Sequence, residues 1–187
     1  YSEGTAHGAP TPGYRREKGI PPDSTTETYV ALKCFVENWR WDGVPFYLRT
    51  GKALPHRASE IAVQFKDIPH ILFNANAQQP QPPNVLALRI QPEEGLSLRI
   101  VSRVPGTRAQ THPVEMDFQY SDVFGRPSPE AYERLLLDVM AGDASRFMRR
   151  DAVEASWAWI TKILEGWPRQ GLRWLPEYPA GTCGPVE

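Results

Sequence analysis

Apolar and polar residues alternate most regularly along two short segments near the middle of the chain. These segments are Ile61-Ala62-Val63-Gln64-Phe65-Lys66 and Leu86-Ala87-Leu88-Arg89-Ile90-Gln91. A period of two places successive side chains on opposite faces, so each segment predicts a β-strand with one buried face. Together with these two, the strand candidates are 45–50, 60–66, 84–91, 95–103 and 114–120. Proline or glycine stands at the joints between them, as expected for turns.

The segment from Thr28 to Trp41 is rich in β-branched and aromatic residues, and two interpretations of it stay open. Alternate positions suit a strand with one face mostly buried, whereas Ala31, Leu32 and Lys33 favour a helix. We favour the strand. Residues 1–23 are rich in Gly, Pro and Thr, which predicts an arm or loop ordered by its neighbours.

Further along the chain the apolar spacing becomes helical. Ser128-Pro129-Glu130 is typical of a helix start, and Gly142 of its end. The apolar positions on one face are Tyr132, Leu135, Leu136, Val139 and Met140. Asp151-Ala152-Val153-Glu154 resembles a capping box and predicts a second helix that stops before Gly166 and Pro168. Strands first and helices afterwards predict an α+β fold with a largely antiparallel sheet.

Composition narrows the class of protein. With 187 residues, 41% hydrophobic and 23% charged, the chain suits one globular domain. A net charge of -1 gives no field that attracts nucleic acid or an anionic membrane, and no apolar run is long enough to span a bilayer. Cys34 and Cys183 lack the spacing of metal ligands, so we expect no metal and a reducing, cytoplasmic location. The chain begins at Tyr1 without methionine, and we expect it to be a piece of a longer protein.

The residues that follow the strand at 45–50 form a candidate anion-binding site. The apolar strand at 45–50 ends in Gly51, where the backbone can bend, and Lys52 follows at once, with Arg57 five residues later. Lysine acts as a point charge on phosphate, and arginine adds a planar fork of donors. The pair therefore suits a small anion such as a sugar phosphate. A solvated, charged hairpin without a ligand is the alternative.

Longer motifs surround this site. They are Pro22-Asp23-Ser24-Thr25-Thr26-Glu27-Thr28, Glu37-Asn38-Trp39-Arg40-Trp41-Asp42-Gly43-Val44-Pro45-Phe46, Arg49-Thr50-Gly51-Lys52, Arg89-Ile90-Gln91-Pro92 and Ala131-Tyr132-Glu133-Arg134-Leu135-Leu136-Leu137-Asp138-Val139. In this order they resemble the C-terminal domain of the glucose-6-phosphate dehydrogenase family. The resemblance runs from Tyr1 to Glu187 and implies a single substrate-binding and dimerisation domain. It also implies a broad sheet with helices on one face, and an open face that pairs subunits into a dimer or tetramer. Residues 33–38 and 114–120 are candidate interface strands.

The resemblance implies that the whole enzyme oxidises glucose 6-phosphate to 6-phosphogluconolactone and reduces NADP, within the pentose phosphate pathway. Lys52 and Arg57 match the family's contacts to the phosphate side of the substrate, and Gln91 matches a substrate-binding glutamine. No Gly-x-Gly-x-x-Gly opens a βαβ unit in this sequence. No segment matches the family's catalytic histidine motif either. We therefore expect the NADP-binding domain to lie outside this chain and the chain alone to be inactive.

A second basic set matches, in some family members, a structural NADP site. It consists of Arg49, Arg89, Arg99, Arg103 and Arg108. Ala58, Ala62 and Ser97 stand where those members carry two cations and an aromatic ring, so we expect no structural NADP here. These arginines are then expected to pair with nearby carboxylates: Glu93, Glu94, Glu115 or Asp117. The alternative function is a free-standing, non-catalytic domain that binds sugar phosphate or assembles with a dehydrogenase subunit.

Overall fold

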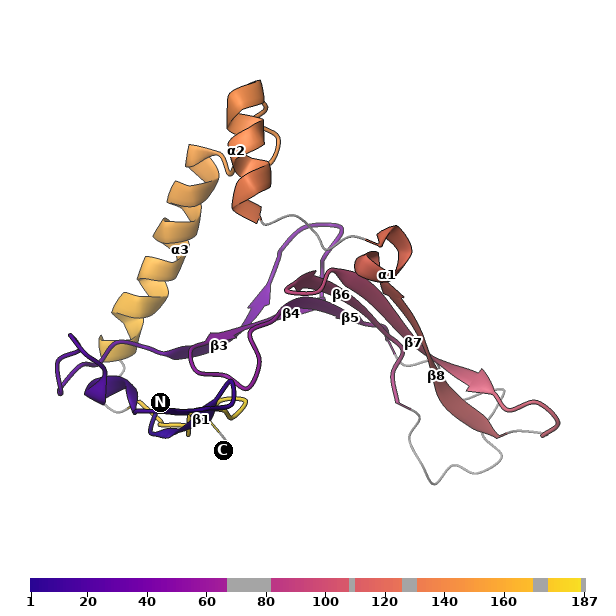
Figure 1. Cartoon of the computed structure of the whole chain (residues 1–187), viewed down its shortest axis with the longest axis horizontal. Coiled ribbons are helices and arrows are strands. Elements are labelled where there is room, and N and C mark those ends of the chain that lie inside the picture. The colour runs from indigo at the N-terminus through magenta and orange to yellow at the C-terminus, as the bar shows by residue number, and fades with distance from the viewer. Residues whose placement is uncertain (67–81, 108–109, 126–130, 170–174, 186–187) are drawn as a thin grey trace. The chain divides into compact units, whose positions relative to one another are not determined.

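The computed structural model describes residues 1–66, 82–107, 110–125, 131–169 and 175–185. The chain forms two compact units. Figure 1 colours the chain by residue number, so the first unit holds both the indigo and the yellow parts. The first unit joins Tyr1–His56 to Phe147–Glu187, and the second consists of Arg57–Arg146. Helices and antiparallel strands both occur, which confirms the predicted mixed fold class with antiparallel pairing. The described strands are distributed over three separate sheets.

The first unit holds two antiparallel strand pairs. Its elements are β1 (Gly4–Ala6), β2 (Ala9–Thr11), the 3-10 turn η1 (Tyr14–Arg16), β3 (Tyr29–Phe35), β4 (Pro45–Gly51) and the helix α3 (Arg150–Arg169). The β1–β2 hairpin turns through His7 and Gly8, whose φ angles of 53° and 79° are those of a two-residue hairpin turn. β3 pairs along its whole length with β4, which confirms a strand for 29–35. Residues 36–41, which the sequence assigned to the same segment, form no strand.

Residues 177–184, here the C-terminal segment, lie beside the N-terminal arm. Ser2 N–H donates to the Tyr178 carbonyl at 2.9 Å, and Thr5 N–H donates to the Ala180 carbonyl at 3.2 Å. Among the described residues, the deeply buried apolar side chains are Ala6, Tyr178 and Ala180, with exposed fractions of 4%, 2% and 4%. The best-packed point of the first unit is therefore where the two ends of the chain meet.

The second unit is built on one antiparallel sheet in the order β5-β6-β7-β8 (Figure 1). Its strands are β5 (Ser59–Gln64), β6 (Val85–Gln91), β7 (Gly95–Arg103) and β8 (Thr111–Gln119). The strand register places one apolar row across the sheet: Val63, Leu86, Leu98 and Met116. The neighbouring row, on the opposite face, is Ala62, Ala87, Ser97 and Asp117. The alternation seen in the sequence therefore gives the sheet one apolar and one more polar face.

Two helices follow this sheet. α1 (Tyr120–Phe124) continues directly from β8, and α2 (Ala131–Ala141) ends at Gly142, whose φ of 72° is the expected left-handed helix end. Arg134 of α2 reaches Glu94, in the turn between β6 and β7, at 3.4 Å. The predicted helix start at Ser128-Pro129-Glu130 lies outside the described residues.

The predicted bounds of the last helix are wrong at both ends. α3 begins at Arg150, so Asp151 stands inside the first turn, and its carboxylate accepts from the Ala152 N–H and pairs with Arg149. The helix therefore starts before the predicted capping box, and Asp151 is a helical residue instead of its cap. At the other end α3 continues to Arg169. Gly166 costs a helix only about 1 kcal/mol, which is too little to stop one of this length.

Candidate functional site

Lys52 directly follows β4 in the first unit, as predicted. Its backbone is held on both sides: the Lys52 N–H donates to the Thr28 carbonyl at 2.8 Å, and the Lys52 carbonyl accepts from the Tyr178 hydroxyl at 2.7 Å. The side chain is exposed, and no carboxylate among the described residues forms an ion pair with it. A fixed backbone and an unpaired ammonium are what an anion-binding lysine requires.

The bend after β4 is formed differently from the prediction. Gly51 ends the strand without a positive φ, and the left-handed residue is Ala53, with φ 49°. The glycine instead leaves room for a side chain, because a Cβ at Gly51 would lie 2.8 Å from Cδ2 of Tyr29. The Ala53 carbonyl accepts a hydrogen bond from the Gly181 N–H at 2.7 Å. The C-terminal segment therefore holds the bend in place.

Arg57 and Gln91 both belong to the second unit. Gln91 is the last residue of β6 and pairs in register with Ser59, two residues after Arg57. Both predicted site residues thus stand at the same end of the β5–β6 pair, and both side chains are exposed. A bulge between Ser59 and Glu60 interrupts the register at this end. Lys52 belongs to the first unit, because the boundary between the units falls between His56 and Arg57.

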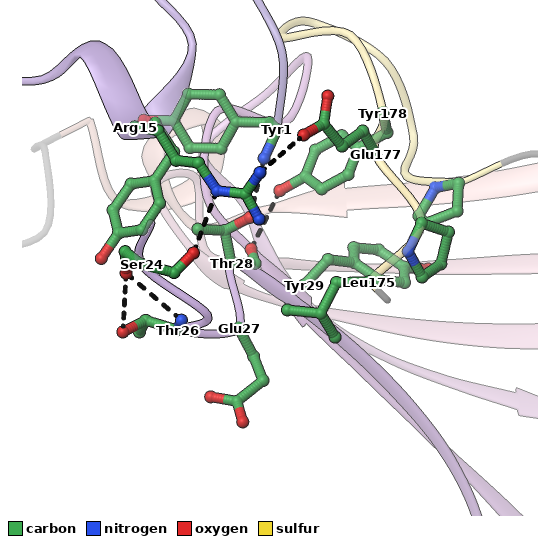
Figure 2. Close-up of a pocket in the computed structure, with 13 residues that line it drawn as sticks. Tyr1, Arg15, Ser24, Thr26, Glu27, Thr28, Tyr29, Leu175, Glu177 and Tyr178 are labelled. Atoms are coloured by element: carbon green, nitrogen blue, oxygen red, sulfur yellow. Dashed lines mark hydrogen bonds and ion pairs between the residues drawn. The ribbon is translucent and has the colours of Figure 1, made fainter. Parts of the chain in front are cut away.

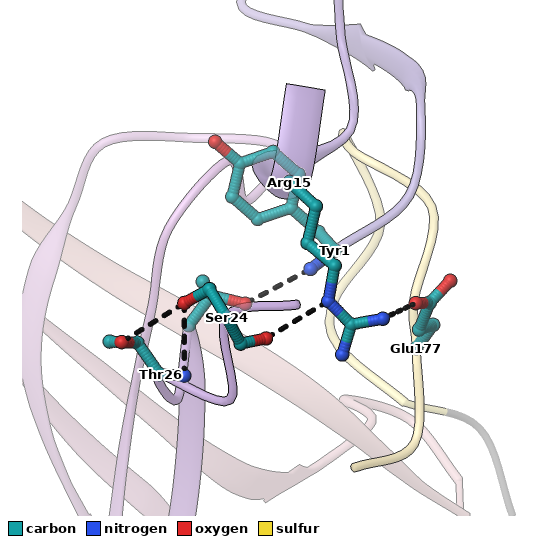
Figure 3. A network of polar contacts seen from close by, with 6 residues as sticks. Tyr1, Arg15, Ser24, Thr26 and Glu177 are labelled. Carbon is teal, nitrogen blue, oxygen red and sulfur yellow. Dashed lines mark hydrogen bonds and ion pairs between the residues drawn. The ribbon is translucent and has the colours of Figure 1, made fainter. Parts of the chain in front are cut away.

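Sequence reasoning missed a network that connects the N-terminal arm with the C-terminal segment. Arg15 donates from Nε to the Ser24 carbonyl at 3.0 Å and pairs with Glu177 at 3.4 Å, as Figure 3 shows. The Tyr1 backbone nitrogen donates to Oγ1 of Thr28 at 3.0 Å. These residues line a small pocket that also contains Tyr178 (Figure 2). Lys52 does not line this pocket, which therefore differs from the predicted site.

Tyr178 is the buried polar centre of this region. Its hydroxyl donates toward the carbonyls of Thr28 and Lys52, at 2.9 and 2.7 Å. Burial raises the pKa of the Tyr178 phenol above its ordinary value. The phenol therefore keeps the proton that these two carbonyls need.

One arginine of the second basic set pairs with one of the expected carboxylates. Arg89 forms an ion pair with Asp117, two strands away on the same face. Ser97 donates to Glu115, and Arg103 donates from Nε to the Thr107 carbonyl at 3.0 Å. Arg108 lies outside the described residues. Among the described arginines of the set, only Arg89 therefore pairs with an expected carboxylate. The expectation about structural NADP stays a prediction.

Other binding chemistry is limited in the part of the chain that the structure describes. There, no three His, Cys, Asp or Glu side chains gather in a group that could hold a metal ion. None of the described helices has the length and apolar character needed to cross a membrane. Cys34 and Cys183 are free thiols.

Comparisons with known proteins agree with one another. A family model described as "Glucose-6-phosphate dehydrogenase, C-terminal domain" matches residues 1–187. The glucose-6-phosphate 1-dehydrogenase of Aggregatibacter actinomycetemcomitans is 52% identical over 186 residues, which is 100% of this chain and 36% of that protein. The corresponding protein of Mycolicibacterium smegmatis is 48% identical over 176 residues, covering 94% of this chain and 35% of its own length.

Solved structures that resemble this chain are also glucose-6-phosphate dehydrogenases. A glucose-6-phosphate dehydrogenase in complex with its substrate glucose-6-phosphate has a TM-score of 0.78 and 33% identity, covering 97% of this chain and 36% of its own. The Mycobacterium avium glucose-6-phosphate 1-dehydrogenase has a TM-score of 0.73 and 34% identity. The match covers 98% of this chain and 36% of that protein. The chain thus spans about a third of the length of these relatives. It belongs to the glucose-6-phosphate dehydrogenase family and corresponds to that family's C-terminal domain.

Proposed function

We propose that residues 1–187 are the substrate-binding and dimerisation domain of an NADP-dependent glucose-6-phosphate dehydrogenase. The observation that carries this proposal is the match of the whole chain to the family's C-terminal domain, including a relative solved with glucose-6-phosphate. The enzyme oxidises D-glucose 6-phosphate to 6-phospho-D-glucono-1,5-lactone. A base takes the hydroxyl proton, and NADP takes the hydride from the same carbon. Both belong to parts of the enzyme outside this chain, which is inactive alone. Two free thiols, Cys34 and Cys183, suit a cytoplasmic location.

Within that enzyme, Lys52 and Arg57 bind the phosphate side of the substrate and Gln91 orients one of its oxygens. Lys52 directly follows β4, Arg57 precedes β5 by two residues and Gln91 ends β6. All three side chains are exposed, where they can meet a ligand. Lysine and arginine provide the positive charge that a phosphate monoester needs. The glutamine amide offers both a donor and an acceptor for a hydroxyl or phosphate oxygen.

Activity of the full-length gene product tests this function. We expect NADPH absorbance to rise with glucose 6-phosphate and far less with glucose, since only the phosphate ester uses the two cations. The isolated 187-residue chain, assayed alongside, is expected to show no turnover. The native product should run at more than twice 21.1 kDa when probed with an antibody to this domain. A native band near 21.1 kDa without activity would favour a free-standing, non-catalytic binding or assembly domain.

We further propose that the enzyme is a homo-oligomer assembled through the β5–β8 sheet, as a dimer or a tetramer. Large apolar side chains on this sheet are exposed in the single chain, including Val63 at 43% and Met116 at 52%. Such side chains gain free energy when a partner covers them, at about 25 cal/mol per Å². β8 also corresponds to the interface strand predicted at 114–120.

A charge placed on the sheet should weaken this assembly. We expect Met116→Glu to shift the full-length enzyme toward smaller species in sedimentation velocity, because a carboxylate cannot be buried there without a partner. Met148→Glu is the matched control, since Met148 is 72% exposed and lies outside the sheet. Equal sedimentation of both variants and the unchanged enzyme would contradict the proposed interface.

A further inference from the structure

The Tyr178 hydroxyl lies between two backbone carbonyls that belong to distant parts of the chain. It is 2.9 Å from the Thr28 carbonyl oxygen and 2.7 Å from the Lys52 carbonyl oxygen. Figure 2 shows the phenol directed at Thr28. The Thr28 carbonyl also accepts from the Lys52 N–H at 2.8 Å. The backbone of Lys52 is therefore held through its N–H by Thr28 and through its carbonyl by Tyr178.

The peptide that follows is held by the same segment. Ala53 adopts a left-handed φ of 49°, which a residue with a Cβ disfavours, so surrounding contacts must hold it. Its carbonyl accepts from the Gly181 N–H at 2.7 Å. The C-terminal segment thus binds two consecutive carbonyls, one through the Tyr178 side chain and one through the Gly181 backbone. Together these bonds set the direction in which the chain leaves β4.

Tyr178 is itself held by several contacts, so its hydroxyl can fix the place of the Lys52 carbonyl. Its own carbonyl accepts from the Ser2 N–H at 2.9 Å, and the Ala180 N–H donates to the Ser2 carbonyl at 3.2 Å. The phenol ring packs edge-on against Tyr29, with ring centroids 5.5 Å apart. Only 2% of the residue is exposed. A buried donor fixed on these sides leaves the Lys52 carbonyl little freedom.

We propose that Tyr178 is a positioning residue for Lys52, holding the backbone from which the lysine reaches the phosphate group of the substrate. The inference rests on the proposed phosphate-binding role of Lys52. Tyr178 itself touches no substrate. A charge-assisted contact depends steeply on placement, and small displacements of a binding group weaken it. Loss of the hydroxyl should therefore affect substrate binding selectively.

The first test replaces the hydroxyl and keeps the ring. In the full-length enzyme, Tyr178→Phe should raise KM for glucose 6-phosphate about three- to tenfold. This is the change in affinity that corresponds to the loss of one neutral hydrogen bond. KM for NADP and kcat should stay unchanged. Tyr14→Phe is the matched control, because this ring lies in the same unit, 5.9 Å from that of Tyr1, and its hydroxyl forms no hydrogen bond among the described residues. An equal rise in both KM values for Tyr178→Phe would overturn the proposal.

A donor at the same place should restore binding. Tyr178→para-aminophenylalanine keeps the ring and provides two N–H groups, one for each carbonyl, so KM for glucose 6-phosphate should return to its original value. If this variant matches Tyr178→Phe in KM, the hydroxyl does not act as a donor and the proposal fails. If Tyr178→Phe does not fold, the amino variant decides: an unchanged KM for glucose 6-phosphate supports the positioning role, and a raised KM overturns it.

A double-mutant cycle separates this inference from the proposed function. If Tyr178 acts through Lys52, Tyr178→Phe should cause no further rise in KM once Lys52→Ala is present. Additive effects would overturn the positioning role and leave the role of Lys52 intact. If Lys52→Ala itself leaves KM for glucose 6-phosphate unchanged, the proposed substrate contact of Lys52 fails, and the inference fails with it.

Discussion

Replacing Lys52 with alanine in the full-length enzyme should raise KM for glucose 6-phosphate about ten- to hundredfold. A hydrogen bond to a charged partner contributes about 1.5–3 kcal/mol, and each 1.4 kcal/mol is a factor of about ten in affinity. The Lys52 ammonium is exposed and forms no ion pair among the described residues. Its removal therefore leaves no unpaired carboxylate in the described part of the chain. Steady-state kinetics with each substrate varied in turn measure the effect.

The rise should be confined to KM for glucose 6-phosphate, and this difference between the two substrates tests the role of Lys52. KM for NADP should change little, because the proposed contact is to the sugar phosphate. Lys18→Ala is a suitable control, since Lys18 is also an exposed lysine of the first unit. We expect Arg57→Ala to act in the same direction as Lys52→Ala. Equal increases in both KM values after Lys52→Ala would contradict a phosphate-binding role and indicate a general loss of structure.

The strands were predictable because one-sided burial imposes a period of two on the sequence. The alternating segment at 60–66 became β5, and β7 has the predicted bounds of Gly95–Arg103. For 28–41 local propensity left helix and strand open. Pairing with β4, from Tyr29 opposite Gly51 to Phe35 opposite Pro45, decides it. Pairing with another strand thus selects the β-strand where local residue preference does not decide between helix and strand.

Other features left no usable local pattern. The β1–β2 hairpin is three residues long on each side, too short for a periodic signal, and its turn uses His7 before Gly8. Gly166 and Pro168 indicate a helix end by sequence, but α3 continues through both to Arg169. These errors concern the ends of elements, where competing local contacts of about 1 kcal/mol decide the outcome.

The candidate site was predictable only in part. Lys52 and Gln91 stand at strand ends, where sequence pattern and resemblance both placed them. The contact that fixes Lys52 comes from Tyr178, 126 residues further along the chain. No spacing rule connects residues so far apart. The left-handed residue was missed for a related reason, since Ala53 has no intrinsic preference for a φ of 49° and is held by Gly181.

Gly181→Ala should destabilise the first unit strongly. Gly181 has a φ of 86°, and a Cβ there would lie 1.8 Å from the Thr5 carbonyl oxygen. The left-handed conformation costs a residue with a Cβ about 1–2 kcal/mol, and forced overpacking adds about 1–3 kcal/mol. The obstacle is backbone, so it cannot rotate away as a side chain could. In thermal unfolding of the full-length enzyme, the transition of this domain should be lowered, by about 2–4 °C for each kcal/mol lost in a unit of about 150–250 residues.

A second glycine provides the control for this prediction. Gly166 lies within α3, and a Cβ there would have no atom within 4 Å. Gly166→Ala should therefore raise stability by up to about 1 kcal/mol, through helix propensity alone. If both alanine variants unfold at the temperature of the unchanged enzyme, the close approach of the C-terminal segment to Thr5 is wrong. If Gly181→Ala is destabilised as expected, its folded fraction should also show a raised KM for glucose 6-phosphate. The Gly181 N–H holds the Ala53 carbonyl beside Lys52, so the stability of the C-terminal segment and the placement of the lysine depend on the same contacts.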